Sequence, residues 1–365
     1  SGYYRAESAA AWGGGIAGGG VVSICEKEKR ESEMKKLGCM LMAVLMAVAV
    51  SGCSDKKEAS ENKETEKKVT LILDYLPNTN HTGFYVAKEK GFFKEEGLDV
   101  DIIEPGDDST SATLVAANKG EFGVSYQEDV TYARTAEEPL PIRAIATIIQ
   151  HNTSGFVSLK KENIKSPKDF EGKVYAGWQA PSEEAVVKAV MTAAKADFSK
   201  LTMVGADGSG FASLGKSVDI QWEFEGWAVT KGRMEGYDLK YIPLRELDER
   251  LDYYTPVIIT SEKMIKEDPE TVQKFMNAVK KGYEYAIENP DAAAEILSKY
   301  APDYDLKFLK ESQKYLSSEY ARDADSWGVM KDSVWDNYTA FMYENKLITE
   351  KIKADEQYTN EFVTK

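Results

Sequence analysis

The sequence predicts an α/β protein built of two lobes, with a helical C-terminal part. Three observations predict this fold class. Apolar strands alternate with amphipathic helices from residue 69 on, the alternation starts again after about residue 158, and residues 262–344 carry helical patterns almost throughout. Strands that alternate with helices are typical of a mainly parallel sheet with helices on its faces.

In the first lobe, apolar segments of strand length are separated by segments with helical periodicity. Gly91 and Gly97 punctuate the end of the first helix and the start of the next strand. The expected elements are strand 69–73, helix 84–96, strand 98–103, helix 109–118, strand 122–126, helix 129–137 and strand 142–149.

In the second lobe, Pro181 followed by Glu183 and Glu184 makes a favourable helix start. The expected elements are strand 173–177, helix 185–195 and strands 201–204, 218–224 and 239–242. After these come strand 257–260 and helices 262–265, 270–288, 291–300, 306–316 and 330–344.

Two α/β lobes joined by more than one crossing suit a venus-flytrap binding protein, the type II periplasmic-binding-protein fold. Its ligand lies between the lobes, at the carboxyl ends of strands from both. We expect lobe one at 69–155, lobe two at 156–254, and the completion of lobe one with the C-terminal helices at 255–365.

The N-terminal part carries an export signal. Met34-Lys-Lys precedes an apolar run at 37–50 and then Val50-Ser-Gly-Cys53, so residues 34–52 are expected to be a signal peptide. The last four of these residues resemble a bacterial lipobox, which implies lipid on the sulfur of Cys53; the alternative is a signal peptide with an incidental cysteine. We expect translation to start at Met34, with 1–33 as non-native upstream sequence, and 53–68 to be a charged, flexible tether. The expected location is the extracytoplasmic face of the bacterial cell membrane, with a lipid anchor.

Composition excludes several classes of function. The cysteines are Cys25, Cys39 and Cys53, so the folded part has no disulfide, thiolate metal site or cysteine nucleophile. A net charge of −15 without a basic block argues against nucleic acid as a partner. His81 and His151 lack a third ligand at metal-site spacing, so we expect no metal, no cofactor and no catalytic residue.

One complete motif match is interpreted as a coincidence of sequence. Residues 210–217 match the P-loop pattern G-x-x-x-x-G-K-[ST]. A P-loop requires a helix to begin at Lys216-Ser217, so that its amides face the phosphates. Because residues 218–224 alternate like a strand, we predict an ordinary glycine-rich loop.

Polar side chains gather where predicted strands end. The segment 74–83, Asp-Tyr-Leu-Pro-Asn-Thr-Asn-His-Thr-Gly, offers a carboxylate, a phenol, two carboxamides and an imidazole directly after a strand. Glu225 and Trp227 follow another strand, in which Trp222 and Phe224 face one side and Glu223 and Glu225 the other. A carboxylate beside an indole recognises a flat heteroaromatic with N–H donors; the alternative is a solvent-facing glutamate and a packing tryptophan.

Three more segments lie at strand ends of this kind. Tyr126 and Gln127 follow the third strand of lobe one, and Trp178 follows the first strand of lobe two. Residues 150–154 connect lobe one to lobe two. Their position predicts a hinge, and their polar side chains leave a role in ligand binding as the alternative.

These segments closely resemble the thiamine-pyrimidine family. The resemblance rests on 74–83, on Tyr85 to Phe93, on Gly177-Trp178, on Pro181 to Glu184 and on Glu225-Gly-Trp227. The family includes bacterial lipoproteins that deliver formylaminopyrimidine to an ABC importer, and the fungal synthase that makes hydroxymethylpyrimidine. The resemblance implies a monomeric binding protein, not an enzyme, that captures a thiamine-precursor aminopyrimidine and hands it to a permease and an ATPase.

The resemblance also implies a set of ligand-binding residues. The lobe-one wall would be Asp74, Tyr75, Asn78, Asn80 and His81, with Tyr126 and Gln127 nearby, and Trp178, Glu225 and Trp227 would face it from lobe two. The family's usual residue after the first Asp is Trp, and the substitution by Tyr75 leaves the exact ligand open: riboflavin or a sulfonate are alternatives. A synthase that consumes His81 is a further alternative, but the fungal enzyme holds iron near a cysteine-rich motif, and this chain has no cysteine after Cys53.

Overall fold

The structure is a computed structural model and describes residues 66–106 and 109–364. The expected start at Met34, the signal peptide 34–52, the lipidation site Cys53 and most of the tether lie outside the described residues. The first strand, β1 (Lys67–Ile72), takes in the last two residues of the expected tether. Lys67 pairs with Leu98 of the neighbouring strand, and its ammonium group donates to Thr271 at 2.8 Å.

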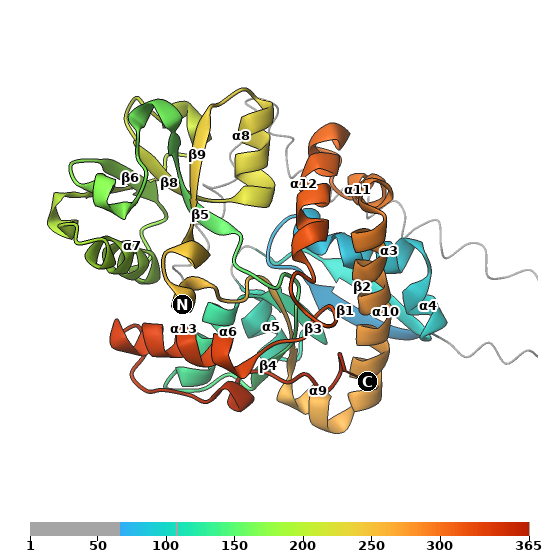
Figure 1. Cartoon of the computed structure of the whole chain (residues 1–365). Helices are drawn as coiled ribbons and strands as arrows, with labels where there is room; N and C mark the ends of the chain where they lie inside the picture. The colour runs from blue at the N-terminus through green and yellow to red at the C-terminus, as the bar shows by residue number, and fades with distance from the viewer. Residues whose placement is uncertain (1–65, 107–108, 365) are drawn as a thin grey trace, which may run out of the picture. The chain divides into compact units, whose positions relative to one another are not determined.

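The first sheet contains β1, β2 (Leu98–Ile103), β3 (Phe122–Ser125), β4 (Ile142–Thr147) and β10 (Val257–Ser261), in the order β2-β1-β3-β10-β4. Side chains that alternate along β1 divide between two apolar clusters. Leu71 packs into the cluster that includes α3 (Thr82–Glu89) and α10 (Pro269–Glu288), and Ile72 into the cluster that includes α5 (Ser111–Ala116) and α6 (Gln127–Thr135). Helices therefore cover both faces (Figure 1).

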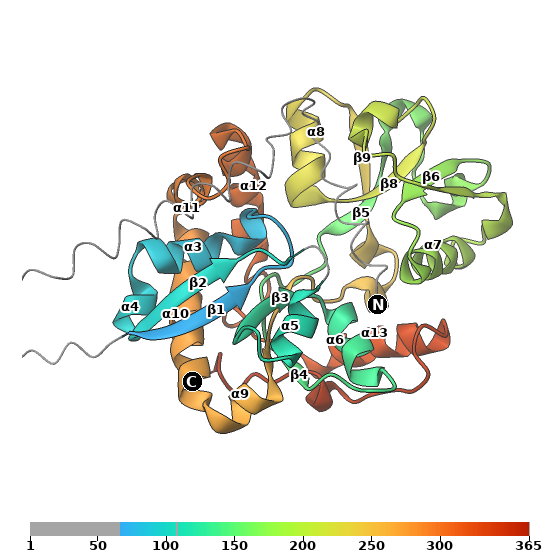
Figure 2. The ribbon, with the colours of Figure 1, turned by 180° about the vertical axis from the view of Figure 1, so that it is seen from behind.

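The second sheet contains β5 (Ser154–Leu159), β6 (Val174–Gly177), β7 (Thr202–Gly205), β8 (Ile220–Phe224) and β9 (Leu239–Pro243), in the order β7-β6-β8-β5-β9. One face packs against α7 (Pro181–Ala193) through Tyr175 and Trp222. The other face carries a smaller cluster with Ala176, Phe211 and Val229, next to α8 (Thr230–Met234). Figure 2 shows α7 and α8 on opposite sides of this sheet.

Each sheet has a single reversed strand. In the first sheet β10 runs antiparallel to β3 and β4, and in the second β5 runs antiparallel to β8 and β9. These two strands follow the points at which the chain passes from one sheet to the other. The expected α/β fold with mainly parallel strands is confirmed. The lobe boundaries drawn from the sequence stay a prediction.

Two elements differ from the sequence analysis. The expected helix 84–96 is two helices, α3 and α4 (Phe92–Glu95), because Gly91 between them takes a left-handed conformation at φ 80°. Strand β5 was not expected, since its first residues, Ser154 and Gly155, are typical of a turn. Gly155 is required by packing: a Cβ there would lie 2.3 Å from the carbonyl oxygen of Ile242.

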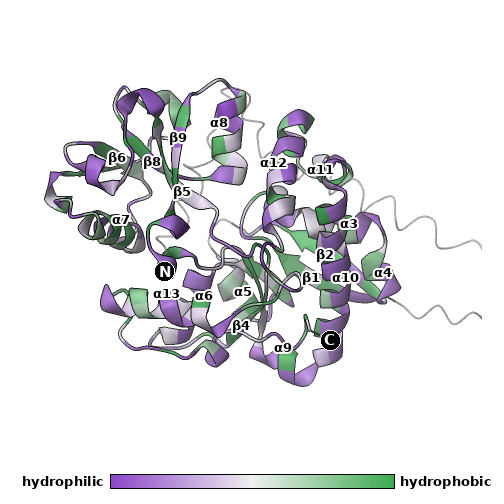
Figure 3. Ribbon diagram, viewed as in Figure 1, coloured by the Kyte–Doolittle hydropathy of each residue, from purple (hydrophilic) through white to green (hydrophobic). Residues whose placement is uncertain are grey.

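The C-terminal part is helical, as predicted, with α9 (Glu262–Glu267), α10, α11 (Pro290–Ser298), α12 (Leu306–Glu319) and α13 (Asp332–Glu344). Hydrophilic residues lie along the outward sides of these helices, and the strands consist mostly of hydrophobic residues (Figure 3). Helix α13 supplies Tyr338, Phe341 and Met342 to the apolar cluster of the second sheet. Trp327 and Trp335, in the same part of the chain, are also buried.

Helix α12 contacts the end of strand β8. The chain after β8 forms one π-helical turn, Glu225–Val229. The Ser312 hydroxyl donates to the carbonyl oxygen of Gly226 at 2.5 Å, and Arg245, after β9, pairs with Glu319 at 2.9 Å.

None of the helices in the described part of the chain has the length and apolar character needed to cross a membrane.

Candidate ligand-binding site

The turn after β1 is held by its own polar side chains. Asn78 precedes a 3-10 turn, Thr79–His81, and its Oδ1 accepts the Asn80 N–H at 2.9 Å. The Asn78 N–H in turn donates to Nδ1 of His81 at 3.3 Å. This reciprocal capping fixes the turn, because it satisfies two amide groups that would otherwise lack partners. Both Asn78 and His81 are buried.

Asp74 lies at the centre of a buried network at the carboxyl ends of β1 and β3. Its Oδ1 lies 2.6 Å from Nε2 of His81, and its Oδ2 accepts the Tyr126 hydroxyl at 2.7 Å. Since Nδ1 of His81 accepts the Asn78 amide, Nε2 carries the ring proton and donates it to Asp74. His81 thus orients the Asp74 carboxylate, and both of its ring nitrogens are engaged.

The electrostatics of this network favour an ionised Asp74. Burial alone would raise the pKa of Asp74, but attraction to His81 and the hydrogen bonds from His81 and Tyr126 hold that pKa below its usual value. Burial and the neighbouring Asp74 carboxylate raise the pKa of Tyr126 well above its usual value. Nearby, burial together with Glu128 and Asp74 raises the pKa of Asp129 to about 7. The site therefore offers one charged acceptor beside a carboxyl group that titrates near neutrality.

An aromatic group forms beside the network. Trp227 is 5 % exposed, and its ring centroid lies 4.9 Å from that of Tyr304 and 4.7 Å from that of Phe308. Burial and the electrostatic influence of Tyr75 raise the pKa of Tyr304. The predicted residues Tyr75 and Trp227 thus both influence or contact Tyr304, although about 150 residues separate them in the chain.

Glu225 has partners in the structure. Its Oε1 lies 3.2 Å from Nη1 of Arg233, and its Oε2 accepts the hydroxyl of Tyr315, on α12, at 3.1 Å. No contact between described residues joins it to Asp74 directly. Gln127 is fully buried and bonds with the backbone of Val334 and Tyr254, so its carboxamide ties α6 to neighbouring chain segments.

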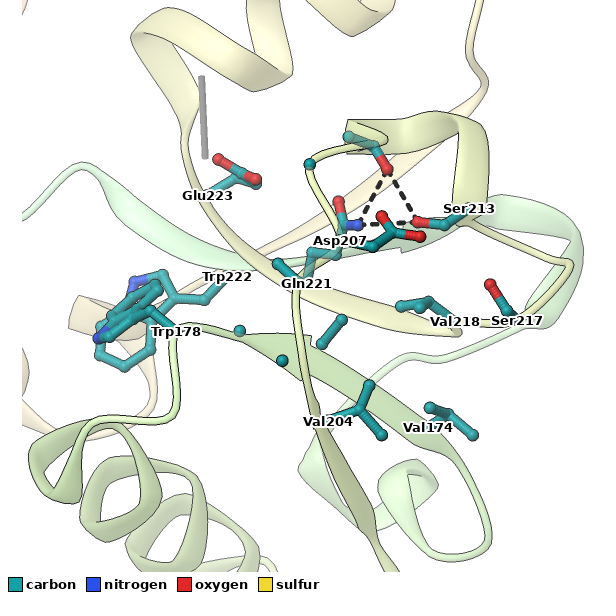
Figure 4. Close-up of a pocket in the computed structure, with 16 residues that line it drawn as sticks. Val174, Trp178, Val204, Asp207, Ser213, Ser217, Val218, Gln221, Trp222 and Glu223 are labelled. Carbon is teal, nitrogen blue, oxygen red and sulfur yellow. Dashed lines mark hydrogen bonds between the residues drawn. The ribbon is translucent and has the colours of Figure 1, made fainter. Parts of the chain in front are cut away.

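Trp178 lies apart from the Asp74 network. Its ring packs at a tilt on Trp222, with centroids 4.9 Å apart, and it lines a cavity against the second sheet (Figure 4). Sequence reasoning did not select Tyr304, Asp129, Gln221 or Glu223. The strand alternation that placed Glu223 beside Glu225 was a usable signal for Glu223, whereas Tyr304 lies in a helix connection with no motif around it.

The P-loop interpretation is excluded by the local structure. Gly210–Ser213 form a short 3-10 turn, no helix begins at Lys216, and strand β8 follows. Each of the two histidine side chains bonds to a carboxylate: His81 to Asp74 and His151 to Asp252, both at 2.6 Å. Within the described ranges, no three histidine, cysteine or acidic side chains converge in a way that would hold a metal ion.

Comparisons with known proteins identify the family. The NMT1/THI5-like family profile matches residues 78–293, and the chain belongs to this family. It is 25 % identical over 331 residues to the formylaminopyrimidine-binding protein of Halalkalibacterium halodurans, covering 88 % of this chain and 98 % of that protein. It is 24 % identical over 320 residues to the 4-amino-5-hydroxymethyl-2-methylpyrimidine phosphate synthase THI13 of Saccharomyces cerevisiae, covering 81 % and 88 % of the two chains.

The fold is similar to that of solved periplasmic binding proteins. The structure of the periplasmic aliphatic sulphonate binding protein SsuA from Escherichia coli superposes with a TM-score of 0.59 at 10 % identity, covering 80 % of this chain and 91 % of that one. The periplasmic-binding-protein fold expected from the sequence is thereby confirmed.

Proposed function

We propose that this protein is the extracytoplasmic solute-binding component of an ABC importer, and that its ligand is a thiamine-precursor aminopyrimidine of the formylaminopyrimidine or hydroxymethylpyrimidine type. The proposal is supported by the fold and by similarity, over nearly the whole of both chains, to a formylaminopyrimidine-binding protein. In this proposal Cys53 carries the lipid anchor, the two lobes close on the ligand, and a separate permease and ATPase receive it.

The buried Asp74 carboxylate is the observation that carries the proposal. A carboxylate has about four lone-pair positions, and two of them are used, by His81 and Tyr126. The remaining positions suit the exocyclic amino group of an aminopyrimidine, because a hydrogen bond to a charged acceptor supplies both energy and orientation. The network holds the carboxylate in place before ligand arrives, which lowers the entropy lost on binding.

Aromatic and polar residues complete the proposed pocket. Tyr75 and Trp227 are proposed as the stacking surfaces for the ring; Trp227 packs on Tyr304, and Tyr75 contributes to raising the pKa of Tyr304. Asn80 and Tyr126 are proposed as additional polar contacts on the lobe-one side, and Trp178 and Glu225 on the lobe-two side. In this scheme Asn78, His81 and Gln127 act by positioning, since each is buried and bonded to its neighbours.

Calorimetric titration of the purified full chain with 4-amino-5-hydroxymethyl-2-methylpyrimidine and with formylaminopyrimidine tests the proposal. We expect saturable binding of at least one of them with one site per chain, and a large loss of affinity in Asp74→Leu. Absence of binding by both, with the protein folded, would refute the aminopyrimidine assignment. Native mass spectrometry of protein purified from its host would then show which solute it retains.

The fungal relative in the same family makes synthesis of the pyrimidine a second candidate. In that activity His81 would be consumed. In this structure the His81 side chain is fully buried, with both nitrogens bonded, and the chain after Cys53 has no cysteine to hold iron. Peptide mass analysis after incubation with iron and oxygen separates the two: a mass change at His81 supports the enzyme, and an intact His81 supports the binding protein.

A further inference from the structure

A cavity of about 280 Å³ lies against the second sheet (Figure 4). Its floor includes Ala176 and Val218, which belong to the apolar cluster on the face opposite α7. Small-molecule pockets usually measure ~300–1,000 Å³. This cavity is therefore suited to a ligand with a single ring.

Gln221 leaves a hydrogen-bond acceptor unused at this cavity. The residue is 5 % exposed, and its Nε2 donates to the carbonyl oxygen of Gly210 at 3.0 Å and to Oγ of Ser213 at 3.1 Å. Its buried Oε1 accepts a hydrogen bond from no described residue. A buried acceptor without a partner is costly, and a ligand N–H entering the cavity would remove that cost.

Glu223 adds a carboxyl group two residues along the same strand. Residues i and i+2 of a strand face the same side, so Glu223 and Gln221 both line the cavity. Glu223 is 7 % exposed, and burial raises its pKa to about 8. Within the described part of the chain, no side chain or amide donates a hydrogen bond to it. The cavity thus presents a buried amide oxygen and a buried carboxyl group, neither of which bonds to a side chain or amide of the described residues.

The rest of the lining fits a flat ligand of positive charge. No lysine, arginine or histidine is among the described residues that line the cavity, and Asp207 adds a second acidic side chain. Trp178, whose ring packs on Trp222, supplies an indole at one end. Indoles attract cations as well as flat rings, whereas an anion would meet two carboxyl groups and no donor of opposite charge.

We propose that this cavity is a second ligand site, and that it binds a small planar cation with N–H donors on one edge, such as an amidinium or a protonated aminopyridine. Glu223 and Gln221 accept its N–H groups, and Trp178 packs on its ring. An amidinium carries several N–H donors, so one can donate to the Glu223 carboxylate and another to Oε1 of Gln221. Among the described residues, Trp178 is the one that this cavity shares with the proposed aminopyrimidine pocket. No residue of the Asp74–His81–Tyr126 network lines the cavity, so loss of the aminopyrimidine site at Asp74 would leave this proposal standing.

Titration calorimetry above pH 8, where Glu223 is ionised, with benzamidine as the probe tests the proposal. We expect the purified full chain to bind benzamidine, and to bind its neutral analogue benzamide at least tenfold more weakly. Glu223→Gln, which keeps the shape and removes the charge, is expected to weaken benzamidine binding by about 10- to 100-fold. Glu235→Gln is the matched control: the same substitution at an exposed position outside the cavity lining is expected to leave benzamidine affinity within about twofold.

Three results would overturn the proposal: no binding of benzamidine to the wild-type chain at millimolar concentration, equal binding by wild type and Glu223→Gln, or a larger loss in Glu235→Gln than in Glu223→Gln. Thermal unfolding of each variant shows whether it is folded. If Glu223→Gln does not fold, Ala176→Val, which adds two methyl groups to the cavity floor, replaces it. Unchanged benzamidine affinity in that variant would contradict the site equally.

Discussion

Removing the Tyr126 hydroxyl tests the central claim about the Asp74 network. Tyr126→Phe deletes one hydrogen bond of 2.7 Å to a buried carboxylate and leaves the ring in place. Hydrogen bonds to charged groups contribute about 1.5–3 kcal/mol, so we expect the free energy of unfolding at pH 7 to fall by that amount. Tyr126 is also one of the groups that lower the pKa of Asp74, so the variant should raise that pKa.

The matched control is Tyr283→Phe, which deletes a buried hydroxyl that donates to the carbonyl oxygen of Asn80 at 2.6 Å. Because this acceptor is neutral, we expect a smaller loss in the free energy of unfolding, about 0.5–1.5 kcal/mol. The two variants also differ in pH dependence. A carboxyl group whose folded pKa is depressed stabilises the protein above its unfolded pKa of about 3.9 and loses that effect as pH falls through the folded pKa.

Urea denaturation of wild type and both variants between pH 7 and pH 3 measures these differences. The deficit of Tyr126→Phe should be constant from pH 7 to about pH 5 and shrink only as pH falls through the lowered folded pKa of Asp74. The deficit of Tyr283→Phe should not change with pH. Equal deficits in the two variants at pH 7, or a Tyr126→Phe deficit that already shrinks between pH 7 and pH 5, would refute an ionised Asp74 at the centre of the network.

Three further predictions follow from contacts described above. Glu225→Gln should weaken aminopyrimidine binding by about 1.5–3 kcal/mol in a calorimetric titration, and unchanged affinity would remove Glu225 from the proposed site. Because the pKa of Glu223 is raised to about 8, wild type should lose stability relative to Glu223→Gln as pH rises from about 4.5 to about 8, by roughly 1.4 kcal/mol per pH unit. The pKa of Asp207 is lowered and that of Tyr175 is raised well above 10, so neither group titrates in this window. A stability difference that stays flat with pH in denaturation experiments would contradict the burial of Glu223. Gly282→Ala would place a Cβ 2.0 Å from the carbonyl oxygen of Gly83, and should lower the free energy of unfolding by about 1–3 kcal/mol or more, whereas a neutral effect would mean that α3 and α10 separate easily.

Local signals predicted much of the fold and the first part of the site. The polar turn after β1 was recognisable because its capping residues and its chemistry lie within ten consecutive positions. The failure at β5 has a physical cause: Gly155 is needed because the backbone of Ile242 passes close to it, and that approach involves residues almost ninety positions apart. Packing of this kind leaves no local pattern.

The partners of the site residues were harder to predict. Glu225 pairs with Arg233 within its own segment, but also with Tyr315, which lies ninety residues further along on α12. Trp227 packs on Tyr304, which lies 77 residues further along. The cavity over Gln221 and Glu223 lies beside a segment that forms only a short 3-10 turn between β7 and β8. Sequence alone indicated a loop there, not the space that the loop leaves.

The contribution of α13 to the second sheet has a consequence for synthesis of the chain. The strands of that sheet lie within residues 154–243, yet its apolar cluster includes Tyr338, Phe341 and Met342. A chain emerging from the ribosome, at about 5–20 residues per second, therefore completes all five strands before the residues that finish packing them exist. During that interval part of the apolar surface of the second sheet stays uncovered. A truncation that removes α13 should consequently harm the second sheet, although the deleted residues follow it by about ninety positions.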